Sequence, residues 1–280
     1  VDPLSWRTIL QVISPRGEQI YRSGPGLSVL LPFPRGQGTC LVPARHVEVE
    51  FLMAREHAII FEDNFEIPVH ALTFEGFRRW VHSPEFPETG RIDFLDGDIE
   101  VDMSPEDLHT HGIVKVAMTS TLHSLVAGRL GEVFSDRTRV VSRFAALSAE
   151  PDAVVVLWKS LQEGRVRYVP AASEEPGRYV EIDGAPDLVV EVVSDSSQRK
   201  DTKKLPPLYA GAGVPELWIA DTRGREIRFQ IHVLDDGTYA PVEADPEGWM
   251  KSPRLGLSFR LTRYSTPLST WYYVLEHREV

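Results

Sequence analysis

The sequence of 280 residues contains a single cysteine, Cys40. One thiol cannot form an internal disulfide or a thiolate zinc cage, so disulfide scaffolds and zinc fingers are excluded. No run approaches the roughly 18 consecutive apolar residues that span a bilayer, and the first residues lack the basic-then-apolar order of a signal peptide. We therefore expect a soluble, cytoplasmic protein that does not enter a membrane.

Sequence signatures of several common activities are missing as well. The chain has no GxxxxGK[ST] phosphate loop, GxSxG elbow, HExxH helix or EF-hand calcium loop. ATP-driven motors, serine hydrolases, zincins and EF-hand sensors are therefore disfavoured. With 42% hydrophobic residues the chain is too apolar to be disordered, and its length suits one large domain or slightly more.

The chain has fewer basic than acidic residues, with 30 Lys and Arg against 41 Asp and Glu. Residues 47–110 hold 16 of the acidic residues and 4 of the basic ones, which leaves 26 basic and 25 acidic residues in the remaining 216. Non-specific affinity for nucleic acid comes mostly from Lys and Arg that neutralise phosphates. The acidic segment argues against tight non-specific DNA binding, whereas the nearly neutral remainder is compatible with a phosphate substrate bridged by a metal ion.

Glycine and proline divide the chain into two regions. Ten of them lie between residues 14 and 45, which predicts irregular structure there, and the alternation over 46–62 predicts one or two strands. We expect an N-terminal extension over residues 1–68, irregular with a few strands, and a folded domain over 69–280. The domain should begin with a helix capped by Thr73 that ends near Trp80.

Further elements follow from turn and cap signals. Asp96-Gly97 predicts a hairpin, and Ser104-Pro105 predicts the start of a helix that continues to about Ala127. Apolar spacing puts Leu108, Ile113, Val116, Leu122 and Val126 on the inner face of that helix. Strands are predicted at 137–144, 152–158, 165–169, 179–182 and 187–193, then a helix from about Ser196 that Pro206 and Pro207 should break or kink, then strands at 216–221 and 227–234. This order indicates an α+β or mixed α/β fold.

Two segments share one pattern of proline, aspartate and an apolar run, and they begin at Pro151-Asp152 and at Pro186-Asp187. The second run contains Glu191, and a carboxylate inside a buried strand needs a partner or a metal ion. Asp187 is four residues from Glu191, roughly 13 Å along a strand, whereas Asp152 can lie beside Glu191 on a neighbouring strand. Two converging carboxylates suit Mg²⁺ or Mn²⁺. The alternative is that Asp152 caps a turn and Glu191 pairs with a buried arginine.

An ordered series of motifs runs from about residue 72 to about residue 275. It comprises residues 94–100, Met103-Ser104-Pro105, His111, Pro151-Asp152, residues 186–194, Arg199-Lys200-Asp201, Tyr209 and residues 213–219. In this order the motifs resemble those of the Uma family of putative restriction endonucleases, a branch of the PD-(D/E)XK nuclease superfamily.

The resemblance implies a restriction-endonuclease-like αβββαβ core with a central mixed sheet and extra β-hairpins. It also implies Mg²⁺-dependent hydrolysis of DNA phosphodiester bonds, with Asp152 and Glu191 as the metal-binding acids. A lysine normally lies two residues after the glutamate, where this chain has Val193. Lys200, Lys203 and Lys204 follow in the next helix, and we expect Lys200 to assist the attacking water; the alternative is that these lysines form an exposed basic face.

Four accessory positions are weaker candidates: His111, Asp187, Lys204 and Glu100. His111 matches a helix histidine of the family, although a lone helix histidine is more often a satisfied polar residue. Asp187 is expected to anchor its strand or lie at the rim of the site, and Glu100 to lie on a solvated strand.

DNA is the expected partner, with Arg137, Arg139, Arg143, Lys203 and Lys204 meeting its phosphates, and a homodimer is plausible from the resemblance. The competing hypothesis is a nuclease-fold module without catalysis that binds nucleic acid or a protein. Val193 and the two prolines favour that second hypothesis.

Overall fold

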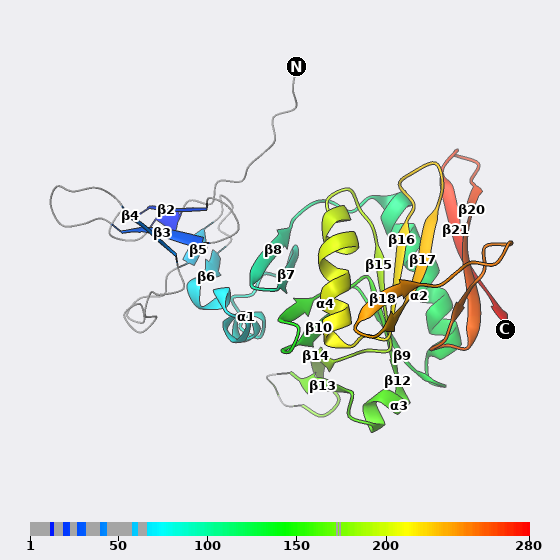
Figure 1. The fold of residues 1–280 in the computed structure, drawn as a ribbon, viewed down its shortest axis with the longest axis horizontal. Coiled ribbons are helices and arrows are strands. Elements are labelled where there is room, and N and C mark those ends of the chain that lie inside the picture. The colour runs from blue at the N-terminus through cyan, green and yellow to red at the C-terminus, as the bar shows by residue number, and fades with distance from the viewer. Residues whose placement is uncertain are drawn as a thin grey trace, which may run out of the picture. The chain divides into compact units, whose positions relative to one another are not determined.

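The computed structural model describes residues 66–171, 173 and 175–280, and by backbone alone residues 12–13, 19–22, 27–31, 40–43 and 58–60. The chain forms two compact units, Val1–Trp80 and Val81–Val280, which are described separately (Figure 1). None of the helices in these described ranges has both the length and the apolarity that a membrane span requires.

The first unit contains short antiparallel strands. A sheet with the order β1-β2-β3-β4 consists of β1 (Val12–Ile13), β2 (Gln19–Arg22), β3 (Leu27–Leu31) and β4 (Cys40–Pro43). It is followed by the pair β5 (Ala58–Ile60) and β6 (Glu66–Pro68), the turn η3 (Val69–Leu72) and α1 (Phe74–Val81). Thr73 Oγ1 accepts the Gly76 N–H at 3.1 Å, which confirms the predicted helix cap. Most of the stretch predicted to be irregular, and residues 46–57 of the predicted strand region, lie outside the described residues.

The second unit contains three sheets among its described residues. One has the order β13-β14-β10-β11-β7-β8, with β7 (Arg91–Leu95), β8 (Asp98–Asp102), β10 (Arg139–Ser142), β11 (Leu147–Ala149), β13 (Val166–Pro170) and β14 (Tyr179–Gly184). Another has the order β18-β17-β16-β15-β12-β9, with β9 (Gly131–Ser135), β12 (Ala153–Leu157), β15 (Leu188–Val192), β16 (Glu216–Asp221), β17 (Arg228–Asp235) and β18 (Thr238–Pro241). The third consists of β19 (Met250–Ser252), β20 (Leu257–Ser265) and β21 (Trp271–Glu279).

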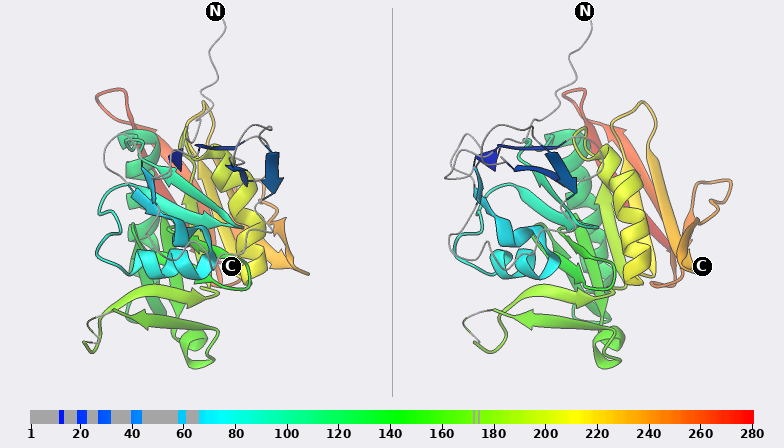
Figure 2. Two further views of the ribbon diagram at one scale, coloured as in Figure 1. Left: turned by 90° about the vertical axis from the view of Figure 1, so that its left-hand side faces the viewer. Right: turned by 60° about the vertical axis from the view of Figure 1, so that its left-hand side comes forward.

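Helices cover both faces of the second sheet. They are η4 (Leu108–Gly112) with α2 (Ile113–Val126), the short α3 (Trp158–Gln162), and η5 (Lys200–Lys204) with α4 (Leu205–Ala212). In chain order α2, β9, β12, β15, α4 and β16 form the predicted αβββαβ core, in which β12 is antiparallel to β9 and β15, and β15 is parallel to β16. The mixed α/β fold is thereby confirmed, and Figure 2 shows β13 and β14 extending from the core beside α3.

The alternation of strand side chains explains how the two helices share the sheet. On β15, Leu188, Val190 and Val192 pack in one apolar cluster with α2, whereas Val189 packs in another with Leu205 and Tyr209 of the η5–α4 segment. Successive strand residues point to opposite faces, so Glu191 shares the α4 face with Val189. The glutamate inside the apolar strand therefore points toward the face of the sheet that α4 covers.

The helix predicted to begin at Ser104 begins later. Its N-cap is Asp107, whose carboxylate accepts the N–H groups of His109 at 3.0 Å and Thr110 at 2.6 Å, which would otherwise lack partners. The buried face of α2 consists of Val114, Met118, Leu122 and Val126 with Lys115 beside them. The inward placement predicted for Leu108 and Val116 is wrong, because these side chains are 75% and 67% exposed.

The helix that carries Pro206 and Pro207 is not broken by them. The π-helical turn η5 closes with the bond from the Leu205 N–H to the Lys200 carbonyl, and the prolines then occupy the first positions of α4. The first residues of an α-helix use no intrahelical N–H donor, so proline fits there. The helix continues to Ala212 and ends at Gly213, which has a left-handed φ of 80°. Glycine adopts this conformation without strain because it has no Cβ atom.

Candidate active site

Asp152 and Glu191 lie close together where β12 begins. Ala153 pairs with Val190 in the antiparallel register of β12 and β15, so Asp152 directly precedes the paired residues. The Asp152 N–H donates to the Val190 carbonyl at 3.1 Å, one residue out of that register, and Asp152 Oδ2 accepts the Val192 N–H at 2.7 Å. The charges of Asp152 and Glu191 interact, and each residue is only 1% exposed. The structure therefore brings together the two acids selected from the sequence.

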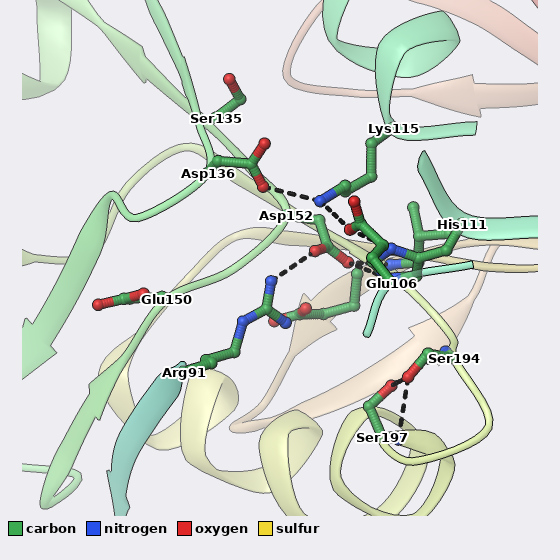
Figure 3. Close-up of polar contacts among 12 residues, drawn as sticks. Arg91, Glu106, His111, Lys115, Ser135, Asp136, Glu150, Asp152, Ser194 and Ser197 are labelled. Carbon is green, nitrogen blue, oxygen red and sulfur yellow. Dashed lines mark hydrogen bonds and ion pairs between the residues drawn. The ribbon is translucent and has the colours of Figure 1, made fainter. Parts of the chain in front are cut away.

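Both oxygens of Asp152 are occupied. Oδ1 accepts Arg91 Nη2 at 2.9 Å, and Oδ2 accepts the Val192 N–H at 2.7 Å, with His111 Nε2 3.5 Å away (Figure 3). Burial raises the pKa of Asp152, but the His111 hydrogen bond and the Arg91 charge outweigh it and hold the pKa well below its usual value. Asp152 is therefore an ionised carboxylate at neutral pH. The alternative hypothesis paired Glu191 with a buried arginine, but in the structure it is Asp152 that forms the ion pair with an arginine, Arg91.

Glu191 has one free oxygen. Tyr209 donates its hydroxyl to Oε1 at 2.6 Å, whereas Oε2 is buried without a hydrogen-bond partner. Burial, together with the charges of Asp201 and Asp152, raises the pKa of Glu191 well above its usual value. A buried polar atom without a partner is rare in folded proteins and indicates a missing ligand, water or proton.

Asp201 is a further acid of this cluster. The Ser197 hydroxyl hydrogen-bonds its Oδ2, while its Oδ1 is buried without a partner. Burial raises the pKa of Asp201 to about 6, and the charge of Asp152 adds to that effect. Sequence reasoning included Asp201 in a motif but gave it no role, since a helix residue ten positions after Glu191 need not approach it.

Lys200 is the lysine that points into the acid cluster. It is 8% exposed, and its Nζ donates to Asp93 Oδ2 at 2.9 Å. Burial lowers the pKa of Lys200, but the charges of Asp93, Glu191 and Asp201 together outweigh burial, and the pKa lies above its usual value. Lys203 is exposed, and Lys204 pairs with Glu100, another of the sequence candidates. Lys200, the lysine preferred from the sequence, is thus the one buried beside an acid of the cluster, and its role in catalysis stays a prediction.

His111 lies between two carboxylates. Its Nδ1 is 2.6 Å from Glu106 Oε1, and its Nε2 faces Asp152 (Figure 3). Glu106 also pairs with Lys115, whose Nζ is 2.8 Å from Asp136 Oδ1. Burial lowers the pKa of His111, but the hydrogen bond with Asp152 and the charges of Asp152 and Glu106 together outweigh burial and raise the pKa above its usual value. Lys115 was not identified from the sequence, because it reads as one lysine on an otherwise apolar helix.

Both helices that face the acids begin with a π-helical turn. The turn Leu108–Gly112 carries His111, and the turn Lys200–Lys204 carries Lys200 and Asp201. Single π-helical turns occur frequently at functional sites, where they change the direction of side chains. A period of 3.6 residues does not predict such turns, which is one reason why the partners of the acids were not foreseen.

Two predicted residues lie elsewhere or are engaged differently. Asp187 directly precedes β15, whereas Glu191 lies near the other end of that strand. The Asp187 carboxylate accepts the Leu157 N–H at 2.8 Å and Arg165 Nη2 at 2.6 Å, which are the contacts of a strand anchor. Arg139 was expected to meet phosphates, but it is 2% exposed and donates to Glu150 and to the Ile92 carbonyl. A buried guanidinium with such partners does not face a nucleic acid, so that expectation is wrong.

A cleft of about 390 Å³ opens beside the acid cluster. Its lining includes Arg91, Asp93, Lys200, Ser196 and Ser197. Ser196 Oγ donates to Asp102 Oδ2 at 2.8 Å, which connects the loop after β15 to the end of β8. Arg91 lines this cleft and also pairs with Asp152, so the cleft lies one side chain away from the paired acids.

The donor set fits a small divalent cation. Asp152 and Glu191 are hard oxygen ligands, and Glu191 Oε2 and Asp201 Oδ1 are buried without partners. Within the described parts of the chain, no three or more His, Cys, Asp or Glu side chains are grouped so that they could hold a metal ion. Mg²⁺ is often bound through one or two carboxylates while water fills its other positions, so two acids are enough.

Comparisons with known proteins found a family and a similar solved structure. The profile of a family described as "Uma2: Putative restriction endonuclease" matches residues 74–264. A crystal structure described as a putative nuclease belonging to DUF820, from Anabaena variabilis ATCC 29413, is similar over 65% of this chain and 90% of that chain, with a TM-score of 0.49 and 18% identity. A search of curated proteins found no match.

Proposed function

The chain belongs to the Uma2 family of putative restriction endonucleases, whose profile covers most of it, and from this membership we propose that it is a metal-dependent endonuclease that hydrolyses DNA phosphodiester bonds. Asp152 and Glu191 would hold Mg²⁺ or Mn²⁺. Lys200 would assist the attack of water. That the protein acts as a homodimer stays a prediction. The division into an N-terminal extension over residues 1–68 and a nuclease domain over 69–280 also stays a prediction.

The observation that supports this proposal most strongly is the free oxygen of Glu191, close to Asp152. A buried ion pair would leave no carboxylate oxygen unused, whereas Glu191 Oε2 has no donor although Tyr209 fixes Oε1. Four buried acids, Asp93, Asp152, Glu191 and Asp201, lie together here, and the pKa values of Glu191 and Asp201 are raised by burial and by the nearby charge of Asp152. A divalent cation bound here would relieve this repulsion between carboxylates.

The protein residues have separate tasks in the proposed reaction. When bound, Mg²⁺ supplies a Lewis acid for the phosphoryl oxygen and lowers the pKa of a coordinated water. Lys200, kept cationic by Asp93, lies where the cleft meets the acids and can stabilise negative charge that develops on the phosphate. Tyr209 and the Val192 N–H hold the two carboxylates in fixed orientations, which reduces the reorganisation required during the reaction.

A cleavage assay tests the proposal. Plasmid, linear duplex and single-stranded DNA are incubated with Mg²⁺ or Mn²⁺ and the full chain, with Asp152→Asn, Glu191→Gln and Lys200→Met as variants and Asp235→Asn as a surface control. We expect divalent-dependent cleavage that falls by about 10²-fold or more in the three site variants and is unchanged in the control. Equal cleavage by Asp152→Asn and by the unaltered protein would refute the assignment.

One observation favours a second function. Val193, at the position where the superfamily normally has its lysine, is fully buried and donates its N–H to the Ala220 carbonyl. The second candidate is therefore a nuclease-fold module without catalysis that binds nucleic acid or a protein partner. Retention of DNA on the protein without cleavage under any of the metal conditions would favour this module.

A further inference from the structure

The oxygens of the two paired acids are held by very different donors. Asp152 Oδ2 accepts a backbone N–H from Val192 and faces Nε2 of His111, which is only 4% exposed. Glu191 Oε1 accepts the hydroxyl of Tyr209, whose side chain is fully buried. Asp152 Oδ1 is held by Arg91, which begins β7 and whose side chain is 21% exposed. Among the donors to these acids that the structure describes, Arg91 is thus the one that can leave without disturbing the backbone or the core.

Arg91 interacts with both of the paired acids. Its guanidinium bonds Asp152 Oδ1 and interacts electrostatically with Glu191 and Asp93 as well as with Asp152. A divalent ion held by Asp152 and Glu191 would need an oxygen from each; Oδ2 of Asp152 is held by the Val192 N–H, and Oδ1 is the oxygen that Arg91 covers. Metal binding and the Arg91–Asp152 ion pair therefore compete for the same atom.

The cleft provides a place for the displaced side chain. Arg91 already lines it together with Lys200 and the hydroxyl groups of Ser196 and Ser197. A guanidinium released from Asp152 would enter this cleft. There it could donate two parallel N–H hydrogen bonds to the oxygens of a phosphodiester.

We propose that Arg91 is a displaceable internal counter-cation that neutralises Asp152 in the metal-free protein, leaves it when a divalent cation binds, and then presents its guanidinium to phosphate in the cleft. This inference deepens the proposed function and rests on its metal site. If Arg91 only held Asp152 in place for the metal ion, its removal would weaken metal binding. A displaceable counter-cation predicts instead that removing Arg91 tightens metal binding.

The first test measures Mn²⁺ binding to the full chain by isothermal titration calorimetry at pH 8, where competition from protons is small. Arg91→Gln is compared with the unaltered protein, with Arg91→Lys, which keeps a cation, and with Asp152→Asn. Arg260→Gln is the matched control, because Arg260 forms an ion pair with Glu276 at 2.5 Å in the third sheet. We expect affinity about tenfold higher in Arg91→Gln, little change in Arg91→Lys and Arg260→Gln, and loss of binding in Asp152→Asn.

The second test uses the unaltered protein, so it remains decisive if Arg91→Gln does not fold. Phenylglyoxal modifies accessible guanidinium groups, and mass spectrometry reports the extent at each arginine. Mn²⁺ should increase modification of Arg91 several-fold and leave the buried Arg139 unchanged. Adding inorganic phosphate together with Mn²⁺ should then protect Arg91, since the guanidinium would be engaged in the cleft.

The outcomes separate this inference from the proposed function. Equal or weaker Mn²⁺ binding by Arg91→Gln, or Arg91 labelling that does not respond to Mn²⁺, overturns the inference, and the metal site stands if Asp152→Asn still abolishes binding. Binding that survives Asp152→Asn, or no binding by any of the proteins, overturns the metal site and the inference together. Phosphate that leaves Arg91 labelling unchanged overturns the placement of the guanidinium in the cleft.

Discussion

Replacing Asp201 with asparagine should stabilise the metal-free protein at neutral pH. The carboxyl group of Asp201 is 1% exposed, close to other acids, and has one oxygen without a partner. Burial raises its pKa from 3.8 to about 6, which corresponds to an upper limit of about 3 kcal/mol. Asparagine keeps the shape and an acceptor for Ser197 but carries no charge, so we expect the free energy of unfolding to rise by about 1–3 kcal/mol at pH 7.5.

The sign of the pH dependence follows from the same shift. A carboxyl group whose pKa is raised by folding binds more protons in the folded state, so its stabilisation is fully present below about pH 4 and is lost as the pH rises through about 6. The difference in unfolding free energy between Asp201→Asn and the unaltered protein should therefore be small at pH 4.5 and reach its maximum above pH 7.

Urea denaturation in EDTA, followed by tryptophan fluorescence between pH 4.5 and 8, measures this difference. Asp235→Asn, an exposed substitution at the end of β17, is the control and should change stability by less than about 0.5 kcal/mol at every pH. A variant that is less stable than the unaltered protein at pH 7.5, or a difference that does not vary with pH, would refute the reasoning about buried charge at Asp201.

Three further substitutions test other parts of the structure by the same denaturation measurement. Tyr209→Phe leaves Glu191 without its hydroxyl donor and should cost about 1–3 kcal/mol, whereas Tyr239→Phe, which frees a single half-buried backbone acceptor, should cost less. Leu122→Ala opens a cavity on the buried face of α2 and should cost about 2–5 kcal/mol; a loss below 1 kcal/mol would contradict this packing. Pro206→Ala should change stability by at most about 1 kcal/mol in either direction, because the proline occupies a first position of α4; a gain of about 3 kcal/mol would instead indicate a strained helix interior.

Local sequence signals were sufficient for much of the fold. The hairpin at Asp96-Gly97, the strand Glu216–Asp221 and the cap at Thr73 lie where turn chemistry and alternation predict them. These features depend on residues only a few positions apart. The helix start predicted at Ser104 is wrong, because the carboxylate of Asp107, three residues later, accepts the N–H groups of His109 and Thr110 and caps the helix.

The sequence by itself determined which residues carry the candidate chemistry: a carboxylate within an apolar strand at Glu191, a second after Pro151, and lysines in the following helix. The tertiary structure decided how they are used, because Arg91 is 61 residues from Asp152, and Lys200 is 107 residues from its partner Asp93. The pairing of β12 with β15 brings Asp152, just before β12, close to Glu191, and two π-helical turns carry His111, Lys200 and Asp201 near these acids. Contacts between residues far apart in the chain depend on pairing and helix phase, which no local pattern encodes, so the counter-charges of the site became visible only in the folded protein.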